Sequence, residues 1–139
     1  MKKLLKCFIL CGVLGWCIEI IFTALGSLRK RDFHLKGVTS LWMFPIYGLS
    51  ILIIPMSKLL KNKSAFIRGT VYMCMIFLVE YTSGHLLKLH KICPWDYSKC
   101  KLNYEGIIRL DYAPFWFATG LLYEKILNLY RNRMSASNN

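Results

Sequence analysis

Glu80 is a carboxylate in the middle of an apolar stretch, and a loop rich in aromatic side chains follows that stretch. The stretch covers about residues 69–89, and the loop contains the consecutive residues Trp95, Asp96 and Tyr97. A charged side chain inside an apolar span is costly, and by default it marks a functional-site hypothesis. The pattern predicts a polar site in which Glu80 supplies an acid and the Trp95-Asp96-Tyr97 loop forms a cap.

Glu19 is a second acid within an apolar stretch, about two-thirds of the way along residues 4–25. In a four-span protein, the first and third helices cross the membrane in the same direction. At about 1.5 Å of rise per residue, Glu19 and Glu80 are then expected at similar depth, roughly one to two helical turns apart. The aromatic loop and the starts of the second and fourth spans would lie on the same side. We therefore predict one polar intramembrane cavity, lined by Glu19, Trp42, Tyr47, Glu80, Trp95, Asp96, Tyr97 and Arg109.

Each of these residues also has a structural interpretation. An intramembrane acid can serve packing alone, through a hydrogen bond to a neighbouring Trp or Tyr. Aromatic side chains such as Trp116 and Tyr130 are typical anchors at the membrane interface. Two acids at matched depth beside an aromatic and acidic loop favour the functional interpretation. The cations that could pair with the acids are Lys36, Lys101 and Arg109.

The composition indicates a membrane protein. Hydrophobic residues make up 55% of the 139 residues, whereas soluble domains usually contain about 45–50%. The net charge is +12, but the basic residues form short clusters between apolar runs, as in loops that face anionic headgroups. No basic motif of a known nucleic-acid reader is present, so we expect the lipid bilayer as partner and no nucleic acid.

The elements that position the predicted site are long apolar segments. We expect an all-α fold, a single integral membrane domain in which a bundle of about four transmembrane helices carries a structured aromatic loop before the last helix. Pro45 and Pro55 are expected to kink the second helix. Glycines spaced with Glu19 along one helix face, at Gly12, Gly15 and Gly26, predict close approach of another segment. The predicted spans are about residues 4–25, 38–56, 69–89 and 107–130, with a polar tail at 131–139.

The distribution of basic residues barely orients these spans. Lys and Arg divide ten against nine between the two sides, which by itself does not decide the topology. If the third loop folds back into a site, its charges are discounted. We therefore predict that the protein lies in the plasma membrane and that both termini are cytoplasmic.

Several kinds of chemistry lack a motif in this sequence. The chain has no Walker-type phosphate loop, no nucleophile elbow and no zinc-hydrolase motif, so we expect no nucleotide hydrolysis by this chain itself. The six cysteines and the pair His85 and His90 have no metal-ligand spacing, and we expect no cofactor or metal. Cys93 and Cys100 would form a disulfide only if their loop faces an oxidising compartment. An enzyme acting on lipid would depend on carboxylates alone.

An ordered set of short motifs carries a family resemblance. The motifs are Gly15-Trp16 with Glu19, Trp42-Met43-Phe44-Pro45-Ile46-Tyr47-Gly48, Glu80-Tyr81-Thr82-Ser83-Gly84, Trp95-Asp96-Tyr97-Ser98, and Asn103 with Gly106. This set resembles the type IV ABC-transporter (CmpB-like) membrane protein family. Residues 34–42 and 93–98 also resemble its animal relatives, the transmembrane protein 229 family. Bacterial members usually place an Arg directly after the last motif glycine, where this chain has Ile107 and carries its Arg at Arg109.

The resemblance implies a multi-pass membrane protein with a role in transport. The predicted lining of the cavity also includes Tyr81 and Asn103, which stand in these motifs. Four spans are few for a complete permease. We therefore expect a homo-oligomer or a partner membrane protein, with a separate ATPase subunit as a possible source of energy. The alternative is an accessory or scaffold membrane protein that transports nothing and binds a partner protein or lipid.

Overall fold

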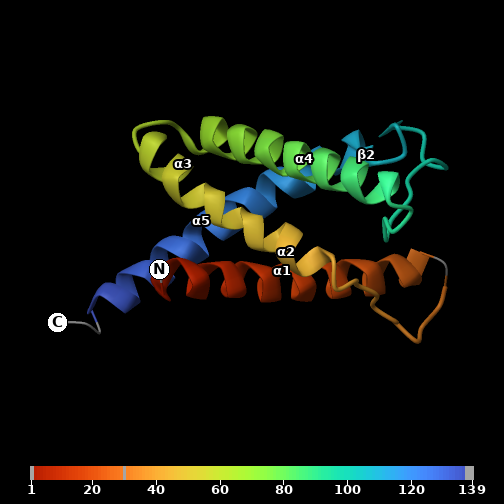
Figure 1. The fold of residues 1–139 in the computed structure, drawn as a ribbon, viewed down its shortest axis with the longest axis horizontal. Coiled ribbons are helices and arrows are strands. Elements are labelled where there is room, and N and C mark those ends of the chain that lie inside the picture. Colours follow the sequence, from red (N-terminus) through yellow and green to blue (C-terminus); the bar gives the residue numbers. More distant parts are fainter. Residues whose placement is uncertain (1, 30, 137–139) are drawn as a thin grey trace. The chain divides into compact units, whose positions relative to one another are not determined.

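The computed structural model describes residues 2–29 and 31–136 and is mostly helical (Figure 1). The chain forms two compact units, Met1–Ile51 and Leu52–Asn139. The all-α expectation is therefore confirmed for the main part of the fold, with one small hairpin in addition. Lys30 of the first basic loop and residues 137–139 of the predicted tail lie outside the described residues.

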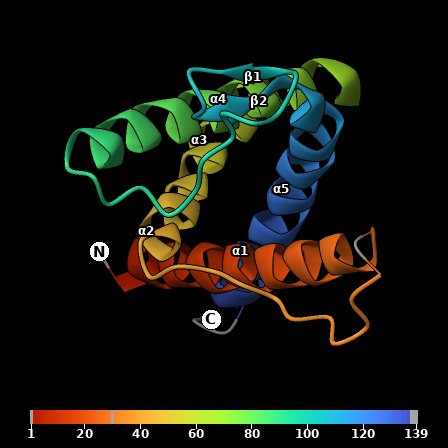
Figure 2. The same cartoon turned by 90° about the vertical axis from the view of Figure 1, so that its right-hand side faces the viewer.

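The first unit contains α1 (Lys2–Arg29), a return segment and α2 (Met43–Gly48). The α1 sequence is apolar and free of proline, and its 28 residues correspond to about 42 Å at the rise of an α-helix. Figure 2 shows residues 31–42 running back along α1, and hydrogen bonds of Trp16 and Thr23 hold this segment there. The return segment thus brings α2 onto one face of α1.

Glycines on that face of α1 allow the close approach. A Cβ atom at Gly12 would lie 2.7 Å from the Phe44 ring, and one at Gly15 would overlap Tyr47. The predicted small-residue stripe is therefore confirmed at these two positions. At Gly26 nothing lies within 4 Å of such a Cβ, so the stripe does not extend along the whole helix.

The segment predicted as the second span is divided into shorter elements. After α2 come a 3-10 turn, η1 (Leu49–Leu52), and α3 (Ile53–Leu59), the first element of the second unit. Pro55 has no N–H group, so the carbonyl of Ile51 lacks its α-helical donor, and the tighter 3-10 geometry precedes it. Residues 38–42 are not helical. The helical part is therefore shorter than the ~20 residues typical of a span.

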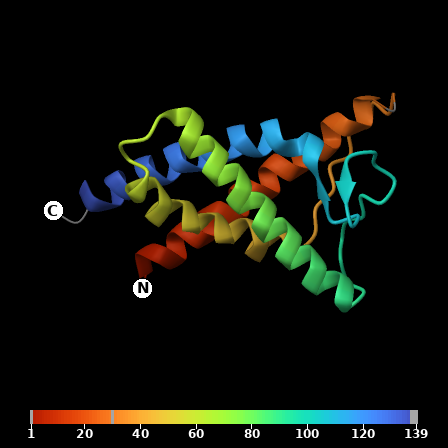
Figure 3. The same cartoon turned by 90° about the horizontal axis from the view of Figure 1, so that it is seen from above.

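The second unit is built on α4 (Ala65–Leu89) and α5 (Ala113–Ala136). Ser64 caps α4, accepting a hydrogen bond from the backbone N–H of Ile67 at 3.4 Å. The two helices cross in Figure 3, and they touch where glycines meet aromatic rings. A Cβ at Gly69 would lie 2.5 Å from the Phe117 ring, and one at Gly120 would lie 2.5 Å from Tyr72 Cβ.

A hairpin lies between α4 and α5, where the sequence predicted the start of the fourth helix. Its strands are β1 (Asn103–Tyr104) and β2 (Ile108–Arg109), and the 3-10 turn η2 (Leu110–Tyr112) follows. Glu105 and Gly106 adopt φ of 53° and 65° at the turn, a conformation that glycine tolerates best. The helix therefore begins at Ala113 instead of near residue 107. It continues to Ala136, into the segment predicted as a tail.

Two helices are long and apolar enough to cross a membrane, α1 over Lys3–Leu28 and α4 over Ala65–Leu89. They contain the segments predicted as the first and third spans. Within the described residues, α5 is of similar length but carries Glu124, Lys125 and Arg131 and does not meet this criterion. The second and fourth spans therefore stay predictions.

Candidate functional site

Glu80 lies on the buried face of α4, and Trp116 of α5 covers it. Only 9% of the surface of each residue is exposed. The Trp116 indole faces the Glu80 carboxyl, yet no hydrogen bond of standard geometry joins them. Among the described residues, Glu80 Oε2 and Trp116 Nε1 are the buried side-chain atoms without a hydrogen-bond partner. Two unsatisfied polar atoms at one place are unusual in a native fold and require an explanation.

The aromatic loop contacts α4 one helical turn beyond Glu80, at Gly84. A Cβ at Gly84 would lie 2.5 Å from Ile107 Cγ2 and 2.9 Å from Trp95 Cζ2. The Trp95 indole N–H donates to the Ile107 carbonyl oxygen at 2.9 Å. Trp95 and Ile107 therefore pack together, and they fit against α4 because residue 84 has no side chain. We call this pair the Trp95–Ile107 cover.

Asp96 and Asn103 hold the loop in shape. Asp96 Oδ1 accepts hydrogen bonds from the Ser98 hydroxyl at 2.5 Å and the Ser98 backbone N–H at 3.0 Å. These bonds, the hydroxyl first, lower the pKa of the Asp96 carboxyl. The Asn103 side chain donates to the Cys100 carbonyl oxygen and accepts from the Gly106 N–H. Both residues were predicted to line a cavity. The hydrogen bonds described here join them to other residues of the same loop.

Arg109 pairs with Asp111, not with the acids that the sequence suggested as its partners. Its guanidinium binds the Asp111 carboxylate, donates to the Tyr112 hydroxyl at 3.0 Å and lies 4.2 Å from the Tyr112 ring centroid. The ring centroid of Tyr97 lies 5.8 Å from the Arg109 guanidinium carbon. Hydrogen bonding from Arg109 lowers the pKa of Asp111, and the same bond raises the pKa of Arg109. Tyr112 in turn lies near Glu80, and burial raises the pKa of its hydroxyl.

The Arg109–Asp111 pair predicts a loss of stability in acid. Because the folded-state pKa of Asp111 is lowered, its contribution is present above the ordinary carboxyl pKa of about 3.9 and is lost as the pH falls through the folded value. Between about pH 5 and about pH 3, the melting temperature of wild type is expected to fall more than that of Asp111→Asn. Thermal unfolding in detergent measures both curves, and parallel curves would contradict the prediction.

Glu19 belongs to the first unit, where hydroxyl groups surround it. The Thr39 hydroxyl donates to Glu19 Oε2 at 2.5 Å, and the Tyr47 hydroxyl also bonds to this carboxyl. On the same face of α1, the Trp16 indole donates to the Ser40 carbonyl oxygen at 3.0 Å. Tyr47 therefore contacts Glu19. The Glu19 carboxylate fastens the return segment to α1.

Two further predicted lining residues are Trp42 and Tyr81. Trp42 is 49% exposed, and the indole that binds the return segment belongs to Trp16 instead. The Tyr81 hydroxyl donates to Glu105 Oε2 at 2.9 Å, and the Tyr81 ring packs against His85 and Tyr104. Tyr81 follows Glu80 directly and therefore projects from a different side of α4, toward the hairpin turn.

The family comparison agrees with the sequence motifs. Residues 6–139 match the family described as "putative ABC-transporter type IV". The chain belongs to this family. No solved structure matches it. The expected membership in the ABC-transporter type IV family is thus confirmed, whereas the relation to the animal transmembrane protein 229 family stays a prediction.

In this member of the family, an ion pair that the sequence did not predict joins α4 and α5. Arg68 Nε lies 3.1 Å from Glu124 Oε1, and the Tyr72 hydroxyl donates to the same carboxylate at 3.0 Å. Tyr72 is fully buried. The spacing of Arg68 and Tyr72, one helical turn apart, is the only signal for a shared partner, and that partner is 52 residues away from Tyr72.

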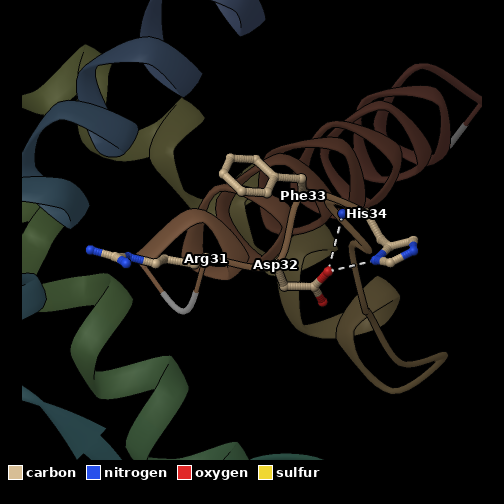
Figure 4. Close-up of a pocket in the computed structure, with 4 residues that line it drawn as sticks. All are labelled: Arg31, Asp32, Phe33 and His34. Carbon is tan, nitrogen blue, oxygen red and sulfur yellow. Dashed lines mark hydrogen bonds and ion pairs between the residues drawn. The ribbon is translucent and has the colours of Figure 1, made fainter.

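A hollow on the exposed turn after α1 holds none of the predicted residues. It has a volume of about 490 Å³ and is lined by Arg31, Asp32, Phe33 and His34. Figure 4 shows Asp32 and His34 pointing toward one another, at 2.8 Å, while Arg31 and Phe33 point away. The His34 hydrogen bonds lower the pKa of Asp32. Since these side chains do not converge, the hollow is a weaker candidate than the surroundings of Glu80.

The described residues show neither a metal cluster nor a disulfide. They contain no group of three or more His, Cys, Asp or Glu side chains that could hold a metal ion. All six cysteines are free thiols, including Cys93 and Cys100, and Cys93 Sγ donates to the Trp95 carbonyl oxygen at 3.2 Å.

Proposed function

We propose that this protein is a membrane-embedded component of a transporter. The observation that carries the proposal is Glu80, a buried acid whose Oε2 atom has no hydrogen-bond partner, on a helix apolar enough to span a membrane. Family membership supports the transport class. The proposal includes the sequence-based prediction that Glu19 and Glu80 line one polar cavity, capped by the Trp95-Asp96-Tyr97 loop. That part depends on the positions of the acids in their apolar segments.

Energy for transport would come from outside this chain. The sequence has no nucleotide-binding motif, so coupling to ATP requires a separate ATPase subunit. We propose that the chain works as a homo-oligomer or with a partner membrane protein. Co-purification from membranes tests this part, and a chain that is monomeric and unaccompanied in mild detergent would contradict it.

Transport can be tested without knowing the substrate. Cells that produce wild type are expected to differ from cells that lack the chain in the level of at least one internal metabolite. Glu80→Gln and the double variant Glu19→Gln/Glu80→Gln are expected to abolish that difference, because the neutral amide removes the charge change that an acid in a pathway provides. Untargeted metabolite profiling provides the measurement.

Asp32→Asn is the matched control for this experiment. It also removes one carboxylate, but from the exposed turn after α1, and it should leave the wild-type profile intact. Equal membrane levels of all variants must be verified by immunoblot. A double variant with a wild-type profile would rule out the transport proposal.

A scaffold function is the second candidate, and the surroundings of Glu19 favour it. Its carboxylate is already bonded to the Thr39 and Tyr47 hydroxyls, as a packing residue would be. On this alternative, Glu19→Gln loosens the return segment and weakens partner capture in detergent, with no change in metabolites. The two functions therefore differ in which measurement the same variants alter.

We further propose a plasma-membrane location with both termini in the cytoplasm. Reporter fusions after residue 139 and within residues 60–66 are expected to give cytoplasmic signals. Opposite signals from the two fusions would contradict this topology.

A further inference from the structure

Glu80 differs from the other six acidic side chains of the chain. Each of those six accepts at least one hydrogen bond from a described residue. The pairs are Glu19 with Thr39, Asp32 with His34, Asp96 with Ser98, Glu105 with Tyr81, Asp111 with Arg109, and Glu124 with Tyr72. Glu80 is the buried one among the acids, and its Oε2 atom has no partner. The most buried acid, for which hydrogen bonds matter most, therefore has an oxygen atom without a hydrogen-bond partner.

An ionised carboxylate is unfavourable in this position. Burying an unpaired ion remains costly even after the protein relaxes. The described groups that interact with the carboxyl include the Trp116 indole of α5 and the Tyr112 phenol of η2, and neither carries a positive charge. Arg109 lies beyond Tyr112, but its guanidinium is engaged by Asp111 and the Tyr112 hydroxyl.

Binding one proton neutralises the Glu80 carboxylate and needs no side chain beyond those already present. A protonated carboxyl is neutral, gains an O–H donor and keeps an acceptor that the Trp116 N–H can approach. A metal ion would need several such ligands, and no group of three or more His, Cys, Asp or Glu side chains occurs within residues 2–29 and 31–136. A proton requires a single oxygen atom and no cavity. The proton is therefore the ligand that this site fits best.

We propose that Glu80 is an exchangeable proton-binding site. The carboxylate takes one proton from water to form a neutral carboxyl in the conformation described here. It returns the proton to water when Trp116 and the Trp95–Ile107 cover move apart from α4. This inference deepens the proposed transport function by naming the proton as its coupled ligand, and only the release step rests on that function.

Infrared spectroscopy tests proton binding without a transport assay. Purified protein in lipid nanodiscs is expected to show the carbonyl stretch of a protonated carboxyl near neutral pH, and that band should fall as the pH is raised to about 10. The band should be absent in Glu80→Gln. It should remain in Glu19→Gln, which removes an acid that has a hydrogen-bond partner.

Glu80→Asp guards against a variant that fails to fold. It keeps a carboxyl group, so the band should shift in frequency and persist. Spectra of wild type without a band that depends on residue 80, at any pH between about 5 and about 10, would overturn the proton site.

The metabolite experiment distinguishes the two proposals. A band that depends on Glu80, together with an unchanged metabolite profile, would overturn transport and support the proton site. A changed profile without the band would overturn the proton site alone.

Discussion

Gly84→Val is expected to lower the free energy of unfolding by about 3 kcal/mol, the upper part of the usual cost of overpacking a buried site. The new side chain would meet Ile107 and Trp95, at 2.5 Å and 2.9 Å for its Cβ alone. The hydrogen bond between the Trp95 indole and the Ile107 carbonyl oxygen ties the two neighbours together. Neither can therefore retreat without displacing the other, and the hairpin must move away from α4.

Gly26→Val is the matched control, because Gly26 is also helical and nothing lies within 4 Å of an added Cβ. Valine is a slightly better helix former than glycine, by about 0.4 kcal/mol, so Gly26→Val should leave stability unchanged or slightly higher. Thermal unfolding in detergent gives the comparison. Equal melting temperatures for the two variants would show that the Trp95–Ile107 cover does not press on α4.

The packing at Gly84 is also expected to affect the protonation of Glu80. Glu80 and Gly84 are four residues apart and therefore lie on the same face of α4. Displacing the cover at Gly84 should admit water to the carboxyl. In Gly84→Val, the infrared band of the protonated acid is therefore expected to weaken at neutral pH, even where the helices remain folded.

The helices α1 and α4 could be predicted because each is one long apolar run without proline. The interrupted segment 38–59 and the hairpin 103–109 were less predictable. Hydropathy describes a residue's preference for lipid or water and says little about local backbone geometry. The break before Pro55 and the positive φ of Glu105 and Gly106 decide the structure there. Gly106 in the sequence Tyr104-Glu105-Gly106 was a turn signal, but the apolar residues that follow it favoured the prediction of a helix.

Pairing between side chains was the hardest feature to predict. Arg109 was expected to reach a distant acid, but it pairs with Asp111, which lies two residues away in the 3-10 turn η2. Trp116 was assigned to the membrane interface, yet it is buried against Glu80. Such pairs depend on which faces of the helices meet. Hydropathy alone does not predict how each helix is rotated about its axis.

Glu124→Ala is expected to lower the free energy of unfolding by about 3 kcal/mol, as for breaking a largely buried ion pair. The Glu124 side chain is 12% exposed and that of Arg68 is 26% exposed, so water screens the pair little. The substitution would leave the Arg68 guanidinium without its carboxylate and the buried Tyr72 hydroxyl without its acceptor. Tyr72→Phe, which removes only one hydrogen bond, should cost about 1 kcal/mol.

A double-mutant cycle separates the pair from the loss of side-chain packing. If Arg68 and Glu124 stabilise α4 against α5 together, Arg68→Ala/Glu124→Ala should lose about 1–2 kcal/mol less than the two single variants added together, because the second substitution removes an already unpaired charge. Additive losses would contradict the pair. The cluster joins α4 to α5, and Trp116 of α5 lies against Glu80 of α4. Weakening the cluster is therefore expected to lower the Glu80 infrared signal as well, although neither Arg68 nor Glu124 touches the acid.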